Sequence, residues 1–298
     1  MRYVVGYTAN ERGRDALNLA AVLARSQDAE LDLVMVDPVH SPYTAVYPPE
    51  SGYRDLLEEQ LKIWLSDALA AVPSDVRAAG YIRNADSDAS GLIAAADELN
   101  AALIVVGAAS NGLFKRFTVG SVANALLHAA QVPVALAPRG YSRTGTLTRI
   151  TCAVGNRRGS EDVLETAVAT AARSGLPLRL VSLVALDASG RDGGAVLEAD
   201  LHAADRLARA QELAAGRCPV TAVVAQGRTI ENAIDDLEFD DGEIMLIGSS
   251  RLAQNNRLFL GPTASKVLRS LPVPMVVVPR NFRSRPAGGT SRPTEVTE

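Results

Sequence analysis

The chain carries the same sequence pattern twice, and this repetition limits the folds that it can adopt. Val105–Gly140 reads VVGAASNGLFKRFTVGSVANALLHAAQVPVALAPRG, and Leu246–Asn281 reads LIGSSRLAQNNRLFLGPTASKVLRSLPVPMVVVPRN. Two glycines and two prolines return at a constant shift of 141 positions: Gly107, Gly120, Pro133 and Pro138 match Gly248, Gly261, Pro274 and Pro279. A repeat of this length indicates a duplicated domain rather than a solenoid unit.

The start of each copy sets the predicted domain limits. YVVGY near the N-terminus returns as CAVGN, which matches Gly6 to Gly155 at a shift of 149. We therefore predict one domain at residues 1–140 and a second, shorter one at 148–281. The polar segment RGYSRTGTLT joins them as a linker. Residues 282–298 are rich in Pro, Gly, Ser and Thr, a composition typical of a disordered tail.

Each copy alternates short apolar runs with longer segments of helical periodicity. In RDALNLAAVLAR, apolar residues such as Ala16, Ala20 and Leu23 fall on one helical face. The short runs are continuously apolar, as in a parallel sheet that helices cover on both faces. The fold class predicted for each copy is α/β, a five-stranded parallel sheet of the flavodoxin or Rossmann type.

The expected elements follow the same order in both copies. Strands are predicted at Tyr3–Tyr7, Leu31–Val36, Val76–Ile82, Leu103–Val106 and Val134–Ala137, then at Thr148–Val154, Leu178–Val184, Val220–Ala225, Ile244–Ile247 and Met275–Val278. Helices are predicted at Arg14–Arg25, Tyr53–Ala71, Ser90–Leu99 and Ser121–Ala130, then at Glu161–Arg173, Ala195–Ala215, Ile230–Leu237 and Thr263–Leu271.

Prolines bracket the last strand of each copy, in VPVALAP and VPMVVVP. Proline cannot donate to a strand ladder, so it marks strand starts and sheet edges. Two similar edge strands in one chain can cover each other. We expect Val134–Ala137 to pair with Met275–Val278 and to form an internal pseudo-dimer; a homodimer of whole chains is left open.

Composition excludes several classes of function. The net charge of −4 and the isoelectric point near 5.5 give no basic surface for nucleic acid. No apolar run is long enough to cross a membrane, and the N-terminus does not resemble a signal peptide, so a cytoplasmic protein is expected. Cys152 and Cys218 lie far apart in apolar runs and are expected to be buried free thiols.

The loop after the fourth strand of the first copy is the best candidate for a ligand site. Ligands of open α/β sheets bind beyond the carboxyl ends of the strands. Gly107 and Gly120 would let the backbone approach a phosphate, and the helix start at Ser121 would attract an anion; Lys115 and Arg116 lie in the same loop. On spacing alone, an ordinary strand–helix connection with turn glycines explains the pattern at least as well.

The glycine loop and the flanking segments VVGYTANERGRDALNLAAVLAR, LDLVMVDPV, LIVVGAAS and GSVANALLHAAQVPVALAPRG resemble the universal stress protein family. The similarity spans nearly all of residues 1–280, in two copies. The resemblance implies a flavodoxin-like fold and pairing through the last strand. It also implies that ATP, with Mg²⁺, or AMP is bound by some members and not by others.

Carried onto the first copy, the resemblance implies a nucleotide site made by Thr8, Asn10, Val36, Gly107, Ser110, Gly120 and Ser121. Ser110 stands where the family has its middle glycine, and Thr8 where nucleotide-binding members have an aspartate. A charge-assisted hydrogen bond contributes about 1.5–3 kcal/mol and a neutral one about 0.5–1.5 kcal/mol. The substitution at Thr8 therefore weakens the predicted site without excluding it.

The second copy departs further from the family pattern. Its candidates are Gly248, Gly261 and Thr263, but Arg251 replaces the middle glycine and Pro262 the hydroxyl residue. Proline suits the first helical position but removes one of the N–H groups that would face a phosphate. Arg157 or a neighbour is expected at the position of the aspartate. We predict a degenerate pocket in this copy.

The sequence gives no sign of catalysis. His40, His128 and His202 are the three histidines, and none has metal-ligand spacing. The glycine and serine motifs of P-loop proteins, dinucleotide-binding folds and serine hydrolases do not occur. We predict a stress-response regulatory protein that binds ATP or AMP in the first copy and is not an enzyme, beyond slow ATP hydrolysis at most. A ligand-free interaction module with two decayed pockets is the alternative.

Overall fold

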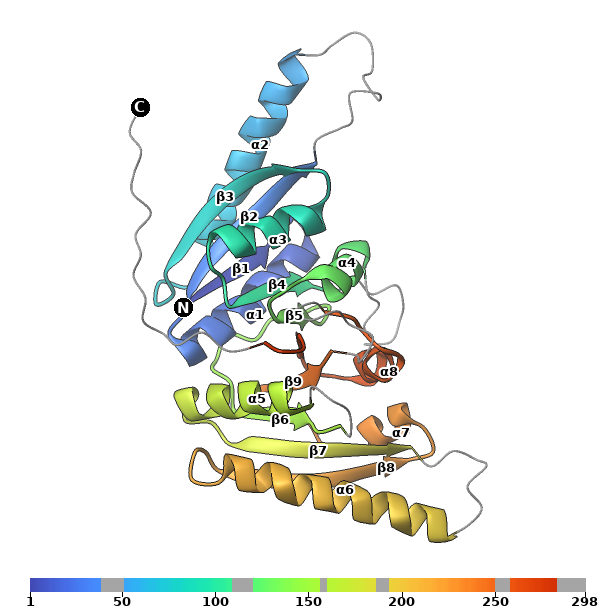
Figure 1. The fold of residues 1–298 in the computed structure, drawn as a ribbon. Coiled ribbons are helices and arrows are strands. Elements are labelled where there is room, and N and C mark those ends of the chain that lie inside the picture. The colour runs from blue at the N-terminus through green and yellow to red at the C-terminus, as the bar shows by residue number, and fades with distance from the viewer. Residues whose placement is uncertain (39–50, 109–119, 156–159, 186–192, 250–257, 283–298) are drawn as a thin grey trace.

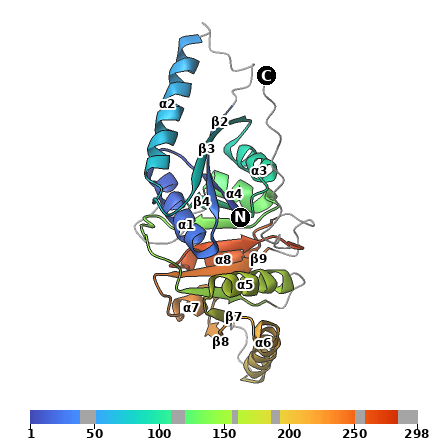
Figure 2. The ribbon, with the colours of Figure 1, turned by 90° about the vertical axis from the view of Figure 1, so that its left-hand side faces the viewer.

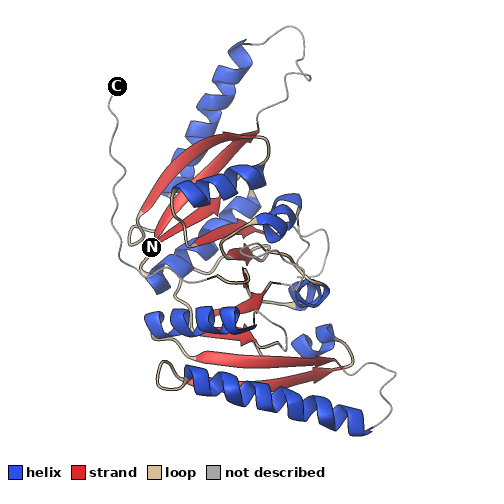
Figure 3. Ribbon diagram, viewed as in Figure 1, coloured by secondary structure: helices blue, strands red, loops and turns tan. Residues whose placement is uncertain are grey.

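A computed structural model of the chain describes residues 1–38, 51–108, 120–155, 160–185, 193–249 and 258–282. Ten strands form a single sheet in the order β3-β2-β1-β4-β5-β10-β9-β6-β7-β8, five from each half of the chain (Figures 1 and 3). Every neighbouring pair within a half is parallel. The predicted α/β class and the duplication are confirmed.

The elements of the first half are β1 (Arg2–Gly6), α1 (Glu11–Gln27), β2 (Glu30–Pro38), α2 (Ser51–Ala70), β3 (Ala78–Ala85), α3 (Asp88–Glu98), β4 (Leu103–Gly107), α4 (Ser121–Ala129) and β5 (Val134–Ala137). Those of the second half are β6 (Arg149–Ala153), α5 (Ser160–Ser174), β7 (Leu178–Ala185), α6 (Gly193–Ala214), β8 (Val220–Gly227), α7 (Ile230–Asp235), β9 (Glu243–Gly248), α8 (Pro262–Ser270) and β10 (Met275–Val278). In both views of the ribbon, α2 extends beyond the sheet (Figures 1 and 2).

The last strands of the two halves pair as expected. β5 and β10 are antiparallel, with Ala135 opposite Val276 in the middle of the ladder. Beside them, the backbone N–H of Leu258 donates to the carbonyl of Ala130 at 2.9 Å. This pairing covers the two strand edges that would otherwise be open, and it makes the internal pseudo-dimer.

The hydrophobic core is shared between the halves. One cluster of buried side chains joins α1 and α2 with α5 and α6 on one face of the sheet. A second cluster joins α3 and α4 with α7 and α8 on the other face. Because each cluster runs across the β5–β10 boundary, the halves bury apolar surface against each other as well as within themselves.

Two helices begin earlier than their apolar periodicity predicts, because polar side chains cap them. The Asn10 side-chain oxygen accepts hydrogen bonds from the backbone N–H groups of Arg12 and Gly13, so α1 begins at Glu11 rather than at Arg14. Ser87 caps α3 in a reciprocal arrangement with Ser90, so that helix begins at Asp88.

Strand register corrects the predicted match between the two copies. Tyr3 pairs with Leu31 in β2 and with Leu103 in β4, while Ile150 pairs with Leu178 and Ile244. β1 and β6 therefore correspond at a shift of 147, not 149. The match of Gly6 with Gly155 was wrong, because local sequence likeness carries no information on strand pairing. Gly155 instead corresponds to Thr8.

One further expectation needs correction. Cys152 is a fully buried free thiol in β6, but Cys218 is only half-buried and precedes β8 instead of lying in a strand. On α2, Trp64 is 37% exposed, beside the buried face that Leu61 and Leu65 form. Tail residues 283–298 lie outside the described part of the chain, so their predicted disorder stays a prediction.

The connection between the halves follows α1 closely. The backbone N–H of Gly140 donates to Asp15 at 2.9 Å, and the Asn18 amide donates to the carbonyl of Tyr141 at 2.8 Å. Leu147, near the end of the connection, is buried. The predicted linker is thus held against the first half along its length.

The buried charges within the strands lie near the amino ends of those strands. Asp32 accepts two hydrogen bonds from Arg2. Glu243 forms ion pairs of 2.6 Å with Arg149 and Arg179. These pairs lie at the end of the sheet opposite to the one where ligands of parallel folds bind. No described helix combines the length and apolar character that a membrane span requires.

Candidate functional site

Both halves contain a cavity at the carboxyl ends of their strands. The first cavity has a volume of about 140 Å³ and lies among β1, β2, β4, α3 and the start of α4. The second cavity has a volume of about 270 Å³ and lies in the corresponding place of the second half, at the start of α8. These are the places where the strand order reverses and where open α/β sheets bind ligands.

Six of the seven residues predicted for the first copy line the first cavity: Thr8, Asn10, Val36, Gly107, Gly120 and Ser121. The seventh, Ser110, lies outside the described residues, as do Lys115 and Arg116. Separate strands and helices supply the six. The structure therefore brings the predicted set together, although no ligand is present to test their role.

Thr8 and Asn10 form a small polar cluster at the start of α1. The Thr8 hydroxyl donates to the Asn10 side-chain oxygen at 3.0 Å. The same oxygen accepts the N–H groups of Arg12 at 3.0 Å and Gly13 at 3.3 Å. Because that oxygen already accepts these hydrogen bonds, the main role of Asn10 is to cap α1. The Thr8 hydroxyl proton is used in its hydrogen bond to Asn10, so Thr8 can only accept hydrogen bonds from a ligand.

Gly107 has a packing role that sequence reasoning missed. A Cβ at this position would lie 2.3 Å from the carbonyl oxygen of Arg12, in the first turn of α1. Only glycine lets the end of β4 approach this helix so closely. The glycine is therefore required by the fold, whether or not a phosphate binds beside it.

The start of α4 is open toward the first cavity. Gly120 is the N-cap residue and makes no side-chain hydrogen bond to the helix. Ser121, Val122 and Ala123 form the first turn and line the cavity. The first N–H groups of a helix have no partner within the helix and carry partial positive charge. An anion held here would complete their hydrogen bonding.

Asp88 is a further residue of the first cavity that the sequence analysis did not single out. It is the first residue of α3, and burial raises the pKa of its carboxyl group above the ordinary value. Together with Arg12 it supplies the charge in the described lining. Its signal in the sequence is an acid in the first turn of the helix that follows the third strand.

The lining of the second cavity has small or apolar residues where the first cavity has polar ones. Gly155 stands at the position of Thr8, and a Cβ built on it would meet nothing within 4 Å. Ile230, the first residue of α7, stands at the position of Asp88. The prediction of Arg157 or its neighbour at the acid position was wrong, because it used the shift of 149, and strand register places Gly155 there instead.

The candidates of the second copy, Gly248, Gly261 and Thr263, all line the second cavity. Pro262 is the first residue of α8, as expected, so one backbone donor is missing there. Arg251 and Arg157 lie outside the described residues. The part that Arg251 takes in the degenerate pocket therefore stays a prediction.

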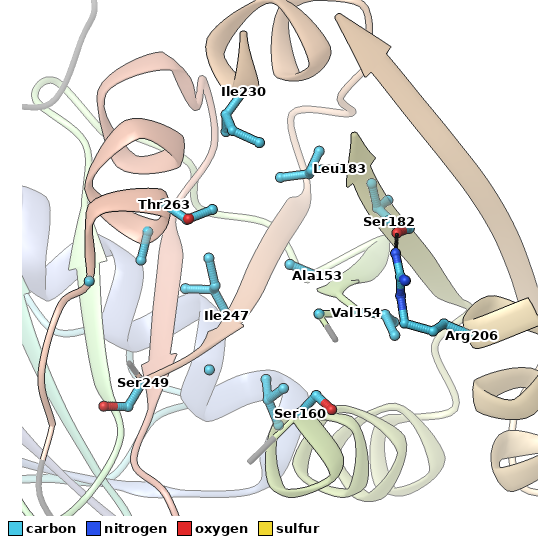
Figure 4. A pocket seen from close by; sticks show the side chains of 16 residues that line it. Ala153, Val154, Ser160, Ser182, Leu183, Arg206, Ile230, Ile247, Ser249 and Thr263 are labelled. Atoms are coloured by element: carbon cyan, nitrogen blue, oxygen red, sulfur yellow. Dashed lines mark hydrogen bonds between the residues drawn. The ribbon is translucent and has the colours of Figure 1, made fainter. Parts of the chain in front are cut away.

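One charged side chain, Arg206 on α6, lines the second cavity, and the sequence analysis did not single it out. Its Nη2 donates to the Ser182 hydroxyl on β7 at 3.2 Å (Figure 4). Its Nε is buried without a hydrogen-bond partner among the described residues. Helical periodicity gives only a weak indication in the sequence that Arg206 faces inward: it lies next to Leu207, which is on the buried face of α6.

No cluster of three or more His, Cys, Asp or Glu side chains that could hold a metal ion occurs among the described residues. His128 is exposed on α4; its Nδ1 lies 2.7 Å from the Asn124 carbonyl, and its ring packs edge-on against Phe259 of the second half. His40 lies outside the described residues. The described histidine contacts are structural.

Two five-stranded parallel units, joined through their last strands and each with a cavity at its switch point, define a tandem α/β protein of the universal stress type. The sequence profile of the universal stress protein family matches residues 1–138 and 146–279. The chain belongs to this family, and the resemblance seen in its sequence is confirmed.

The relatives cover most of the chain. It is 30% identical over 293 residues to the universal stress proteins Rv2319c of Mycobacterium tuberculosis and Mb2346c of Mycobacterium bovis, covering 94% of this chain and all of each relative. A universal stress protein from Archaeoglobus fulgidus superposes with a TM-score of 0.69 at 19% identity, covering 94% of this chain and 98% of that one. A putative universal stress protein from Pseudomonas aeruginosa superposes at 0.58, also at 19% identity, over 94% and 93%. The solved structures show a shared fold.

Proposed function

We propose that this protein is a stress-response regulatory protein that binds an adenine nucleotide, ATP or AMP, in the first cavity. The observation that carries the proposal is the start of α4 at Gly120 and Ser121, which no side chain of the described residues caps and which lines the same cavity as the ends of β1 and β2. A helix start supplies donors for phosphate, and the strand ends supply contacts for the base and the ribose.

Each part of the nucleotide has a place in this proposal. The phosphate nearest the ribose lies at the first turn of α4, where Ser121 adds a hydroxyl donor. The ribose lies near Asp88 and Thr8, which accept hydrogen bonds from its hydroxyls. The adenine lies against Val36 at the end of β2. With ATP, Mg²⁺ would accompany the outer phosphates.

The size of the first cavity bears on affinity. At about 140 Å³ it is smaller than the roughly 300 Å³ at the lower end of typical ligand pockets. Part of the nucleotide therefore lies outside the cavity, and we expect weak binding. We further propose that the nucleotide is a regulatory ligand and that the protein is not an enzyme.

Calorimetric titration with AMP and with Mg–ATP tests the proposal. Ser121→Pro removes one backbone donor and the hydroxyl, as Pro262 does in the second half. We expect it to weaken binding by at least about tenfold, because two donors to the phosphate are lost. Ser121→Ala, which loses the hydroxyl alone, should weaken binding less. No binding of either nucleotide at millimolar concentration, or an unchanged affinity in Ser121→Pro, would contradict the site.

A ligand-free interaction module is the second candidate. Two observations favour it: the Asn10 oxygen is committed to capping α1, and Gly107 is explained by packing against Arg12. Both residues would be kept by the fold with no nucleotide bound. The same titration distinguishes the two candidate functions, since an interaction module without a ligand predicts no heat of binding with either nucleotide. It also predicts that neither nucleotide raises the thermal stability of the protein.

A further inference from the structure

We propose that the second cavity binds a compact organic anion with an apolar body, and that the positive charge of Arg206 makes the cavity prefer an anion to a neutral ligand. This ligand class and this residue are separate from the nucleotide proposed for the first half. The proposal rests on three observations: the chemistry of the cavity lining, the lack of an ion-pair partner for Arg206 in the described part of the chain, and the replacement of apolar residues at two positions that hydrogen-bond to each other in the second half.

The lining of the second cavity is apolar with a single charge. Side chains such as Val154, Leu183, Ile230 and Ile247 form its walls, with hydroxyls of serine and threonine between them (Figure 4). Among the described lining residues Arg206 is the only ionisable one, and none is acidic. An apolar wall with one fixed cation favours a ligand that has an apolar body and one anionic group.

Arg206 on α6 differs from the arginines at the amino ends of the strands. Arg2 is paired with Asp32, and Arg149 and Arg179 are paired with Glu243. Arg206, by contrast, forms no ion pair in the described part of the chain, and its one hydrogen bond goes to neutral Ser182. A half-buried cation without a counter-charge is unfavourable, so a bound anion would stabilise it.

The first half shows that packing does not require a cation at this position. The buried face of α2 contains Leu61, Leu65 and Ala68, and the same spacing on α6 contains Ala203, Leu207 and Ala210. With that alignment, Arg206 takes the position of Trp64. Strand register likewise places Ser182 at the position of Met35. Two apolar residues from separate elements have been replaced by a hydrogen-bonded polar pair.

The geometry also limits the ligand. A volume of about 270 Å³ lies just below the roughly 300 Å³ at the lower end of small-molecule pockets, which favours a compact ligand. Pro262 removes one donor from the helix start that would otherwise hold a chain of phosphates. A single carboxylate or a similar single anionic group, held by the guanidinium, fits this site better than a triphosphate does.

Binding of 2-naphthoate and of its neutral isostere 2-naphthamide to the full chain tests the proposal. We expect calorimetry to show naphthoate binding at least about tenfold more tightly than the amide, because only the acid is an anion. Arg206→Met should remove that preference by weakening naphthoate to the level of the amide. Arg206→Lys should keep part of it.

Two matched variants control for general effects of charge and packing. Arg209→Met removes the same charge from the same helix, at an exposed side chain paired with Asp205, and should leave the preference unchanged. Trp64→Met alters the equivalent position of the first half and should also leave it unchanged. Equal affinity of the wild-type chain for acid and amide, or a preference that survives in Arg206→Met, would overturn the proposal.

AMP separates this proposal from the one for the first cavity. AMP binding should be weakened by Ser121→Pro and left unchanged by Arg206→Met, whatever the result with naphthoate. If AMP competes with naphthoate in the Ser121→Pro background, the second cavity is a nucleotide site and the ligand class proposed here is wrong. If AMP does not bind at all, the naphthoate preference still decides the present proposal.

Discussion

Asn10 illustrates how a single residue can satisfy both a helix and a candidate site. Its side-chain oxygen accepts the first N–H groups of α1 and the Thr8 hydroxyl. The sequence allowed a ligand contact to be predicted at both residues, but hydrogen-bond capacity is a property of the folded cluster. The capping role is visible only when the partners of that oxygen are counted.

Removing this cap should destabilise the protein. We expect Asn10→Ala to lower the free energy of unfolding by about 1 kcal/mol, because two helix N–H groups lose their acceptor. Urea denaturation measures the difference. Asn10→Asp is the control, since a carboxylate can accept the same bonds and should retain most of the stability. Equal loss in both variants would show that the cap is not the source of the effect.

Cys152 makes stability depend on pH in the alkaline range. Burial raises the pKa of its thiol from 9.0 to about 12 in the folded protein. The contribution of this thiol to the free energy of unfolding is complete below pH 9. It is lost as the pH rises from about 9 to about 12, because only the thiol of the unfolded protein ionises in that range. The slope for one such group is about 1.4 kcal/mol per pH unit.

We therefore expect Cys152→Ala to unfold with a shallower dependence on pH between 9 and 11 than the wild-type protein. Urea midpoints at a series of pH values measure this slope. Cys218→Ala is the comparison, because that thiol is only half-buried and should change the slope less. Parallel pH profiles for wild type and Cys152→Ala would show that this thiol titrates in the folded state.

At the scale of elements, the close contact between the end of β4 and the start of α1 depends on a glycine. Gly107→Ala should lower the free energy of unfolding by about 1–3 kcal/mol, because the new Cβ meets the Arg12 carbonyl at 2.3 Å. Gly155→Ala should be nearly neutral, since that position is open. Thermal unfolding without any nucleotide compares the two. A Gly107→Ala protein as stable as wild type would mean that the helix can shift away.

Periodicity and apolar runs were sufficient to predict every strand and helix, including β5 and β10 with their observed limits. Helix starts were less accurate, since capping decides them and the apolar stripe does not. The match between β1 and β6 failed by two residues, because register depends on hydrogen bonds between strands distant in sequence. Asp88 and Arg206 were not predicted as cavity residues for a related reason. Each lies on a helix, and the strands against which that helix packs are known only from the folded structure.

At the scale of the whole molecule, the duplication has produced one body with two unlike cavities. The halves share both hydrophobic clusters and the antiparallel β5–β10 ladder. Outside that shared region the copies differ freely: Thr8 and Asp88 are replaced by Gly155 and Ile230, while α6 brings Arg206 into the second cavity. A fused pair can change one cavity without changing the other, which two identical subunits cannot do.

The shared core predicts that the halves unfold together. Trp64 is the only tryptophan of the chain and reports on the first half, while the buried thiol of Cys152 reports on the second. In a Cys218→Ser background, the urea midpoint from Trp64 fluorescence should coincide with the midpoint for labelling of Cys152. Val276→Asp places a charge in the β5–β10 ladder opposite Ala135 and should separate the two midpoints, because it weakens the boundary that both clusters cross. Different midpoints in the protein without this substitution would mean that each half is stable alone and that the boundary contributes little.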